Sequence, residues 1–134
     1  MTVALAYQVV GRGDGPPLVL LHSLGSDRSM WAPQVPAWAA TRRVVALDLR
    51  GHGRSPAPEG PYTLRELGAD VLAVMDEVGA PVADLCGISL GGQIALWITA
   101  NHPERVRRLV AGATAARIGS AEGWAARMQA VRDG

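Results

Sequence analysis

Short, mainly apolar runs separated by polar and glycine-rich turns are the dominant pattern of this sequence. Leu18–Leu21, Val44–Leu47 and Val82–Cys86 are runs of this kind, and they are typical of parallel strands that helices bury on both faces. Val106–Ala111 predicts a last strand, and the alternation over Thr2–Val10 predicts an edge strand. The pattern therefore predicts a sheet built mostly of buried strands.

Helical patterns fill the intervals between most of these runs. Thr63–Glu66 (TLRE) is a capping box, and Gly79 is placed to end the helix that the box opens. A second helix is predicted after Ser89, and a short one within Trp31–Ala40 begins near one of its prolines. Strands that alternate with helices predict a parallel sheet with right-handed crossovers, hence an α/β fold.

Length and composition fit a single globular domain. The 134 residues are 49% apolar and 19% charged, with a formal net charge of +1, so neither a disordered tail nor an electrostatic surface for nucleic acid is expected. The basic residues are all arginine, and the pairs Arg42-Arg43 and Arg107-Arg108 are predicted to be solvated.

Cysteine content and hydropathy bear on where the protein resides. The single Cys86 excludes an intrachain disulfide and suits a reducing compartment, where it is predicted to pack in the core. The N-terminal stretch MTVALAYQ lacks the basic segment of a signal peptide, and no apolar run reaches the ~18 residues of a membrane span. We therefore expect a cytoplasmic protein that does not bind membranes.

The candidate chemistry centres on Gly87–Gly92 (GISLGG), between an apolar strand and a helix. The spacing G-x-S-x-G fits a tight turn, because a Cβ two residues before or after the serine would collide with the crossing backbone. Gly87 and Gly91 remove those collisions and leave Ser89 strained, with its hydroxyl above the sheet. The helix N-terminus adds N–H groups and a partial positive charge. The turn predicts an acyl-transfer nucleophile; the alternative is a glycine-rich turn that only ends a strand.

Three stretches at their separations in this chain, HSLGSDRSMW, DLRGHGRS and CGISLGG, resemble the N-terminal part of the α/β-hydrolases. Thr114–Trp124 (TAARIGSAEGW), together with HSLGSDRSMW, is similar to the 3-oxoadipate enol-lactonases, which open an enol-lactone ring in aromatic-acid catabolism, the β-ketoadipate pathway. The resemblance implies an α/β-hydrolase fold with a mostly parallel sheet. It also implies that residues 1–113 are the N-terminal part of the core and residues 114–134 the beginning of a helical lid.

The same resemblance implies roles for particular residues. The backbone N–H groups of Leu24 and Leu90 would form the oxyanion hole, where one donor is worth about 2.7–4 kcal/mol in a protease example. Trp124 would line the substrate pocket, and Arg117 and Arg127 would bind a substrate carboxylate. The alternatives are packing of Trp124 within the lid and ordinary surface charge for the two arginines.

The acid and base of a catalytic triad have no candidates in this chain. The fold orders its triad as Ser, then Asp or Glu, then His, and the one histidine after Ser89 is His102. A helix of about 11 residues puts His102 about 16 Å away, at ~1.5 Å per residue. His22 is predicted to shape its loop, and His52 and the charged groups of Asp48–Ser55 to be structural. We therefore expect that a further segment or a partner chain supplies the acid and base, and that this chain alone is inactive.

Three functions remain open from the sequence. The first is hydrolysis of 3-oxoadipate enol-lactone to 3-oxoadipate. The second is another carboxylic-ester hydrolase or a cofactor-free haloperoxidase-like enzyme, and the third is a non-catalytic binding protein of the same fold. The expected ligand is a small lactone or ester; because no His, Cys, Asp and Glu residues have metal-ligand spacing, neither metal nor organic cofactor is expected. The last strand has an open edge, which predicts association with another polypeptide.

Overall fold

Five strands form one sheet in the computed structural model, which describes residues 1–134. The strands are β1 (Tyr7–Val10), β2 (Leu18–Leu21), β3 (Val44–Leu47), β4 (Ala83–Ile88) and β5 (Val106–Gly112). Their order across the sheet is β1-β3-β2-β4-β5; β1 runs antiparallel to β3, and every other pair is parallel. The α/β fold predicted from the sequence is confirmed.

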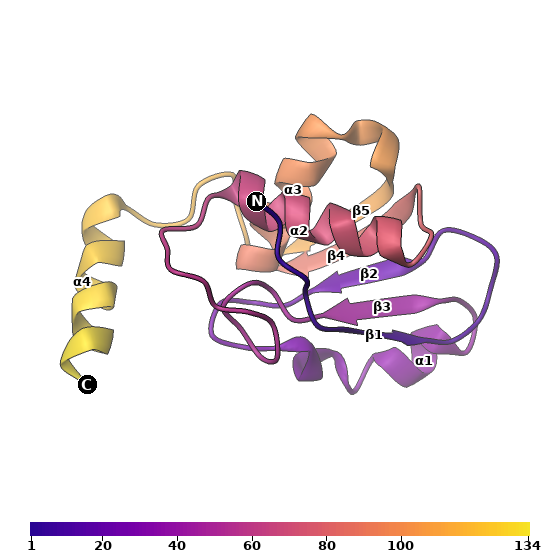
Figure 1. Ribbon diagram of the computed structural model, residues 1–134, viewed down its shortest axis with the longest axis horizontal. Helices are drawn as coiled ribbons and strands as arrows, with labels where there is room; N and C mark the ends of the chain where they lie inside the picture. The colour runs from indigo at the N-terminus through magenta and orange to yellow at the C-terminus, as the bar shows by residue number, and fades with distance from the viewer.

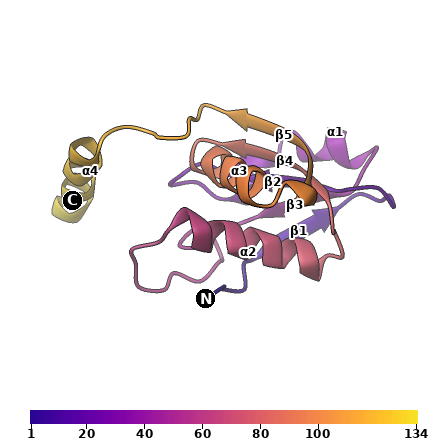
Figure 2. The same cartoon turned by 90° about the horizontal axis from the view of Figure 1, so that it is seen from above.

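Helices connect the strands and cover both faces of the sheet (Figure 1). The α-helices are α1 (Val35–Ala39), α2 (Leu64–Glu77), α3 (Leu90–Asn101) and α4 (Ala121–Asp133), and the 3₁₀ helices are η1 (Arg28–Trp31) and η2 (Pro103–Arg105). α2 and α3 lie on one face of the sheet and α1 on the other (Figures 1 and 2). Because β2, β3 and β4 are parallel, the loops that follow them meet at one end of the sheet.

Buried side chains form a layer on each face of the sheet. The larger layer packs strand residues against α2 and α3, and its members include Val19, Val45, Leu85, Met75 and Ile94. The smaller layer, on the side of α1 and η1, consists of Leu20, Val44, Ala46 and Trp31. Packing from both faces holds the ends of the strands in place, and the loops at those ends start from fixed positions.

The boundaries of α2 agree with the capping box in the sequence. The Thr63 hydroxyl accepts from the Glu66 N–H at 3.2 Å, and the Glu66 carboxylate accepts from the Thr63 N–H at 2.9 Å. Beyond the other end, Gly79 has φ +67°, a left-handed conformation that favours glycine. Local signals of this kind are sufficient to set where the helix begins and ends.

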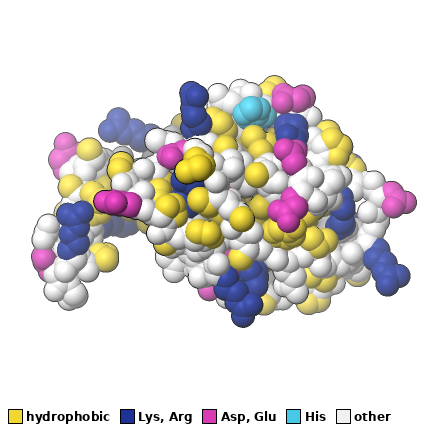
Figure 3. Space-filling view, in the orientation of Figure 1, with side chains coloured by type: hydrophobic (Ala, Val, Ile, Leu, Met, Phe, Trp, Pro, Cys, Tyr) yellow, Lys and Arg dark blue, Asp and Glu magenta, His cyan; other side chains and the backbone are white.

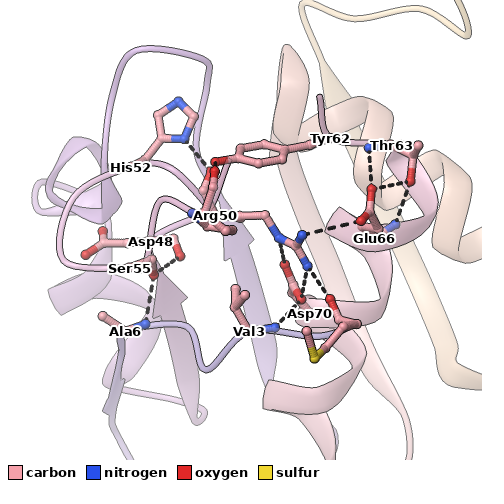
Figure 4. Close-up of polar contacts among 12 residues, drawn as sticks. Val3, Ala6, Asp48, Arg50, His52, Ser55, Tyr62, Thr63, Glu66 and Asp70 are labelled. Atoms are coloured by element: carbon pink, nitrogen blue, oxygen red, sulfur yellow. Dashed lines mark hydrogen bonds and ion pairs between the residues drawn. The ribbon is translucent and has the colours of Figure 1, made fainter. Parts of the chain in front are cut away.

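The edge strand β1 begins at Tyr7 rather than at Thr2, which corrects the sequence prediction. Before β1, the Ala6 carbonyl accepts from the Asp48 N–H just beyond β3 at 2.8 Å, and the other contacts of this segment are to side chains (Figure 4). The Val3 N–H donates to Asp70 at 2.8 Å. The buried Arg50 guanidinium donates to Asp70 at 2.8 and 2.9 Å and to the carbonyl of the first residue at 2.8 Å. These contacts join the N-terminal segment to α2, and alternation in the sequence cannot reveal them.

Two of the arginines predicted to be solvated, Arg42 and Arg107, bind a buried carboxylate. Asp84 in β4 is 4% exposed and accepts from Arg42 at 2.7 Å and from Arg107 at 2.7 and 2.9 Å. These guanidinium groups, Arg107 foremost, hold the pKa of Asp84 below its usual range. Arg42 and Arg43 are only partly exposed, contrary to the prediction, whereas Arg107 and Arg108 are exposed as expected. The ion pairs with Asp84 were not foreseen, because Asp84 lies inside a strand whose partners the sequence does not identify.

α4 stands apart from the rest of the molecule at the end of an extended linker (Figures 1 and 2). In the space-filling view it forms a separate lobe beside the main body (Figure 3). Ser120 caps the start of the helix, since its hydroxyl accepts from the Gly123 N–H at 3.1 Å. None of the side chains of α4 is fully buried.

None of the helices has the length and hydropathy needed to cross a membrane.

Candidate active site

β4 and α3 meet at Ser89, which lies between them. Ser89 is half-buried and has φ 54° and ψ −114°, a conformation that costs a non-glycine residue about 1–3 kcal/mol. A Cβ on Gly87 would lie 2.3 Å from the Gly91 carbonyl oxygen, and a Cβ on Gly91 would lie 2.2 Å from the Leu21 carbonyl oxygen. Only glycine fits on either side of this strained serine.

Hydrogen bonds hold the backbone of Ser89 on both sides. Its N–H donates to the Gly112 carbonyl at 3.0 Å, and its carbonyl accepts from the Gln93 N–H at 3.0 Å and from the Thr114 hydroxyl at 2.8 Å. Gly112 and Thr114 carry no local sequence signal of this role, because only the pairing of β4 with β5 brings them to the turn.

The side chain of Ser89 does not cap the helix that follows it. Serine is one of the residues preferred at this position because its hydroxyl can accept from the first helical N–H groups. Here the Ser89 side chain makes no such hydrogen bond to α3. Its hydroxyl and the N–H groups at the start of α3 therefore remain available to a bound molecule.

The two predicted oxyanion donors lie on neighbouring segments. Leu90 is the first residue of α3, where an N–H group has no partner within the helix. Leu24 lies in the loop after β2, the strand beside β4, and its N–H donates to no group of the chain. The start of α3 packs against this loop, since a Cβ on Gly91 would also approach the His22 carbonyl oxygen to 2.7 Å. The fold thus places the loop of Leu24 beside the turn of Ser89.

An open groove of about 570 Å³ lies between α4 and the loop after β2. Three of the predicted site residues line it, namely Leu24, Trp124 and Arg127, with Met128 and Val131 as further apolar wall. The Arg127 guanidinium carbon stands 5.1 Å from the centroid of the Trp124 ring, within the range of a cation–π interaction. A cation and an apolar wall therefore share one groove.

The other predicted site residues lie outside this groove. Ser89 and Leu90 are half-buried at the turn, and Arg117 is exposed in the linker before α4. Trp124 is anchored to the same linker, because its ring N–H donates to the Ile118 carbonyl at 2.6 Å.

None of the three histidines forms a hydrogen bond with Ser89. His102 lies at the far end of α3, with its ring 5.7 Å from Trp97. His22 and His52 use both ring nitrogens in hydrogen bonds to backbone groups. Burial is the main cause that lowers the pKa of His22, which keeps the ring neutral.

Asp48, one of the acidic residues before Ser89, is also engaged. Asp48 accepts from the Arg28 side chain at 2.9 Å and from the Arg28 and Arg54 N–H groups at 2.8 and 3.1 Å. Asp48 therefore joins its loop to the neighbouring turn at Arg28, which agrees with the structural role expected for it. No three His, Cys, Asp or Glu side chains converge as metal ligands, and Cys86 is half-buried in the sheet, where burial raises the pKa of its thiol.

In the comparison with known proteins, one protein family matches most of the chain. The family described as alpha/beta hydrolase fold matches residues 16–132. A 3-oxoadipate enol-lactonase of Acinetobacter baylyi is 43% identical over 131 residues, which make up 98% of this chain and 49% of that protein. The chain therefore spans about half the length of the curated relatives it matches.

Solved structures show the same likeness in three dimensions. The enol-lactonase from Burkholderia xenovorans superposes with a TM-score of 0.92 at 46% identity, covering 96% of this chain and 50% of that one. A hydrolase from Pseudomonas aeruginosa has a TM-score of 0.92 at 42% identity, covering 97% of this chain and 49% of that one. The architecture and the turn around Ser89 thus occur in a chain that resembles hydrolases in both sequence and structure.

Proposed function

This chain belongs to the α/β-hydrolase fold family, and we propose that Ser89 is the nucleophile of a serine hydrolase that opens a lactone ring. The turn at Ser89 carries the proposal. A strained serine stands between two glycines that admit no Cβ, and its hydroxyl does not cap the helix. If this turn served only to end β4, neither the strained backbone of Ser89 nor its uncommitted hydroxyl would be needed.

In the proposed first step, Ser89 Oγ bonds to the lactone carbonyl carbon and gives its proton to a histidine base. The carbonyl oxygen takes up the electron pair and becomes an oxyanion, which accepts hydrogen bonds from the Leu24 and Leu90 N–H groups. The base and its acid partner come from a further segment or from a partner chain, because the histidines of this chain are engaged elsewhere.

Collapse of the oxyanion breaks the ring C–O bond and completes the acyl-enzyme. The leaving oxygen takes the proton from the histidine as an enol, which rearranges to the ketone. Water then attacks the ester carbonyl, with the same base accepting its proton, and Ser89 Oγ leaves with a proton as the acid is released. The two N–H groups stabilise the second oxyanion as they do the first.

The groove beside Leu24 supports a substrate that is apolar on one side and anionic on the other. Leu24, Trp124 and Met128 offer apolar contact, and Arg127 is held over the Trp124 ring. Arginine suits a carboxylate because its planar guanidinium donates two parallel hydrogen bonds. Together with the similarity to enol-lactonases, this favours 3-oxoadipate enol-lactone, with Arg127 as its carboxylate partner and Arg117 as a second cation from the linker.

The experiment is a reconstituted enzyme in which residues 1–134 are joined to the part of the Acinetobacter baylyi relative that lies beyond the matched residues. We expect a fluorophosphonate to label Ser89 and the enzyme to hydrolyse the enol-lactone faster than simple aryl esters. Ser89→Ala should abolish labelling and hydrolysis, whereas Ser29→Ala, which changes an exposed hydroxyl in η1, should preserve both.

Other outcomes select other functions. A preference for aryl esters over the lactone would indicate another carboxylic-ester hydrolase, and oxidation of halide by peroxide would indicate a haloperoxidase-like enzyme. A reconstituted enzyme that shows cooperative unfolding but never labels at Ser89 would contradict the proposal and leave a binding protein of this fold.

A further inference from the structure

Two histidine rings lie edge to face beside the loop that carries Leu24. His22 follows β2 and His52 lies in the turn after β3, with their ring centroids 5.0 Å apart at an interplanar angle of 63°. All four ring nitrogens are hydrogen-bonded to backbone groups. The loop itself has little packing to hold it, since the Leu24 side chain is 53% exposed and nothing lies within 4 Å of a Cβ placed on Gly25.

His22 fixes the peptide group that precedes Leu24. Its Nε2 accepts from the Leu49 N–H at 2.8 Å, so the proton of the neutral ring is on Nδ1, which donates to the Ser23 carbonyl at 2.8 Å. The Ser23 carbonyl and the Leu24 N–H are opposite ends of one planar trans peptide group. Holding the carbonyl therefore sets the direction in which the Leu24 N–H points.

His52 fixes the peptide group that follows Leu24. Its Nε2 accepts from the Gly25 N–H at 3.1 Å, and its Nδ1 donates to the Arg50 carbonyl at 3.0 Å. The Gly25 N–H shares a planar group with the Leu24 carbonyl. Each peptide group beside the Leu24 Cα is therefore held by a different ring.

We propose that His22 and His52, together the histidine clamp, are positioning residues that orient the Leu24 N–H toward the oxyanion. The inference rests on the proposed role of Leu24 as an oxyanion donor. Neither ring touches the reacting atoms; each acts through a peptide group. Turning the Leu24 N–H away would break at least one of these hydrogen bonds, so the donor is preorganised before substrate binds.

The clamp requires both rings to be neutral. A proton on Nε2 would replace the acceptor with a donor that faces the Leu49 or Gly25 N–H. The charged groups around the pair are Asp27, Asp48 and Arg28, with Arg28 paired to Asp48. Burial and the neighbouring His52 lower the pKa of His22, while the Ser23 carbonyl and the two carboxylates oppose them.

The sign of the pH dependence follows from the lowered pKa of His22. The unfolded chain takes up a proton on this ring near pH ~6.5, whereas the folded state resists the proton until the pH is lower. Between these two pKa values the unfolded state binds more protons, so folding stability falls as the pH falls. Orientation of the Leu24 N–H in the folded protein is expected to weaken only at lower pH, where the folded state itself takes up a proton on His22.

Solid-state ¹⁵N NMR of the 134-residue chain labelled at histidine tests the clamp, and it applies whether or not the chain self-associates. Near neutral pH we expect Nδ1–H tautomers at both His22 and His52. The variants His22→Gln, His52→Gln and His102→Ala each remove one histidine signal and so assign the spectrum. An Nε2–H tautomer at either clamp position would overturn the proposal, because that ring could not accept from the loop.

Kinetics of the reconstituted enzyme test whether the clamp acts on catalysis. His52→Ala should lower kcat about tenfold with KM changed by less than about twofold, because orientation of a transition-state donor is lost. His52→Gln should restore kcat to within about threefold of the unmodified value, since its amide oxygen can accept from the Gly25 N–H. An unchanged kcat in His52→Ala, or equal losses in both variants, would overturn the proposal.

Failure of the clamp and failure of the proposed function give different results. His102→Ala, at the far end of α3, should leave kcat unchanged and serves as the control. If Ser89 is never labelled, the proposed function fails, but the NMR measurement of the histidine tautomers still tests whether both rings accept hydrogen bonds as the clamp requires. If Ser89 is labelled but a clamp ring carries its proton on Nε2, the clamp alone fails.

Discussion

At the scale of single residues, the turn of Ser89 depends both on hydrogen bonds to its backbone and on glycines that have no Cβ. Ser89 keeps a left-handed backbone because Gly112, Gln93 and Thr114 bind its peptide groups. Gly91 allows the start of α3 to touch the backbone at the end of β2. The proposed oxyanion hole depends on this tight approach, because it places the start of α3 against the loop that carries Leu24.

Gly91→Ala tests this approach. The added Cβ would lie 2.2 Å from the Leu21 carbonyl oxygen and 2.5 Å from its carbon, both backbone atoms that cannot rotate away. We expect the free energy of unfolding in urea to fall by about 3 kcal/mol, even though alanine is the better helix former. Gly15→Ala is the matched control, because nothing lies within 4 Å of its Cβ; it should change stability by less than about 0.5 kcal/mol. Equal stability of the two variants would contradict the close packing.

At the scale of elements, α2 and α4 begin with similar caps but differ in what they bury. α2 starts at the capping box of Thr63 and contributes buried side chains to the larger core layer. α4 starts at Ser120, buries no residue fully and stands away from the sheet. The unfolding of α2 is therefore coupled to that of the sheet, whereas α4 can fray by itself.

Removal of each cap should separate these two behaviours. Thr63→Ala should lower the free energy of global unfolding by about 1 kcal/mol, the usual cost of a lost N-cap. Ser120→Ala should leave the midpoint of global unfolding unchanged. It should reduce only the helical circular dichroism signal that is lost at temperatures below that midpoint. Circular dichroism through a thermal ramp measures both. A similar loss of midpoint in the two variants would show that α4 packs on the core in solution.

The sequence predicts those features that are determined by residues close together in the chain. β2, β3 and α2 begin and end where short apolar runs and the capping box place them, because neighbouring residues decide these boundaries. The G-x-S-x-G spacing identified the turn of Ser89 for the same reason. The pairing of Asp84 with Arg42 and Arg107 comes from strand order and contacts between distant residues, so pattern alone gave no sign of it.

At the scale of the whole molecule, β5 is an edge strand and one of its faces is uncovered. Leu109 packs toward α3, whereas Val110, on the opposite face of the strand, is 61% exposed. On α4, Val131 is 82% exposed. An unpaired edge and bare apolar side chains favour association with another polypeptide.

We expect the 134-residue chain by itself to self-associate in small-angle scattering as its concentration is raised. Val110→Lys should reduce this association, because charge on an edge strand opposes further pairing. Val131→Lys is the matched change on α4 and should have the smaller effect if β5 is the main contact. A monomer at all concentrations would contradict the prediction, and a larger effect of Val131→Lys would assign the contact to α4.

The position of β2 between β3 and β4 also sets an order of events during synthesis. Leu18 pairs with both Val44 and Asp84, and these two partners leave the ribosome about forty residues apart. At about 5–20 residues per second, β2 and β3 can meet for several seconds before β4 emerges. During that interval the edge of β2 that will pair with β4 is free, so a nascent chain is most exposed to chaperones there, shortly before Ser89 emerges.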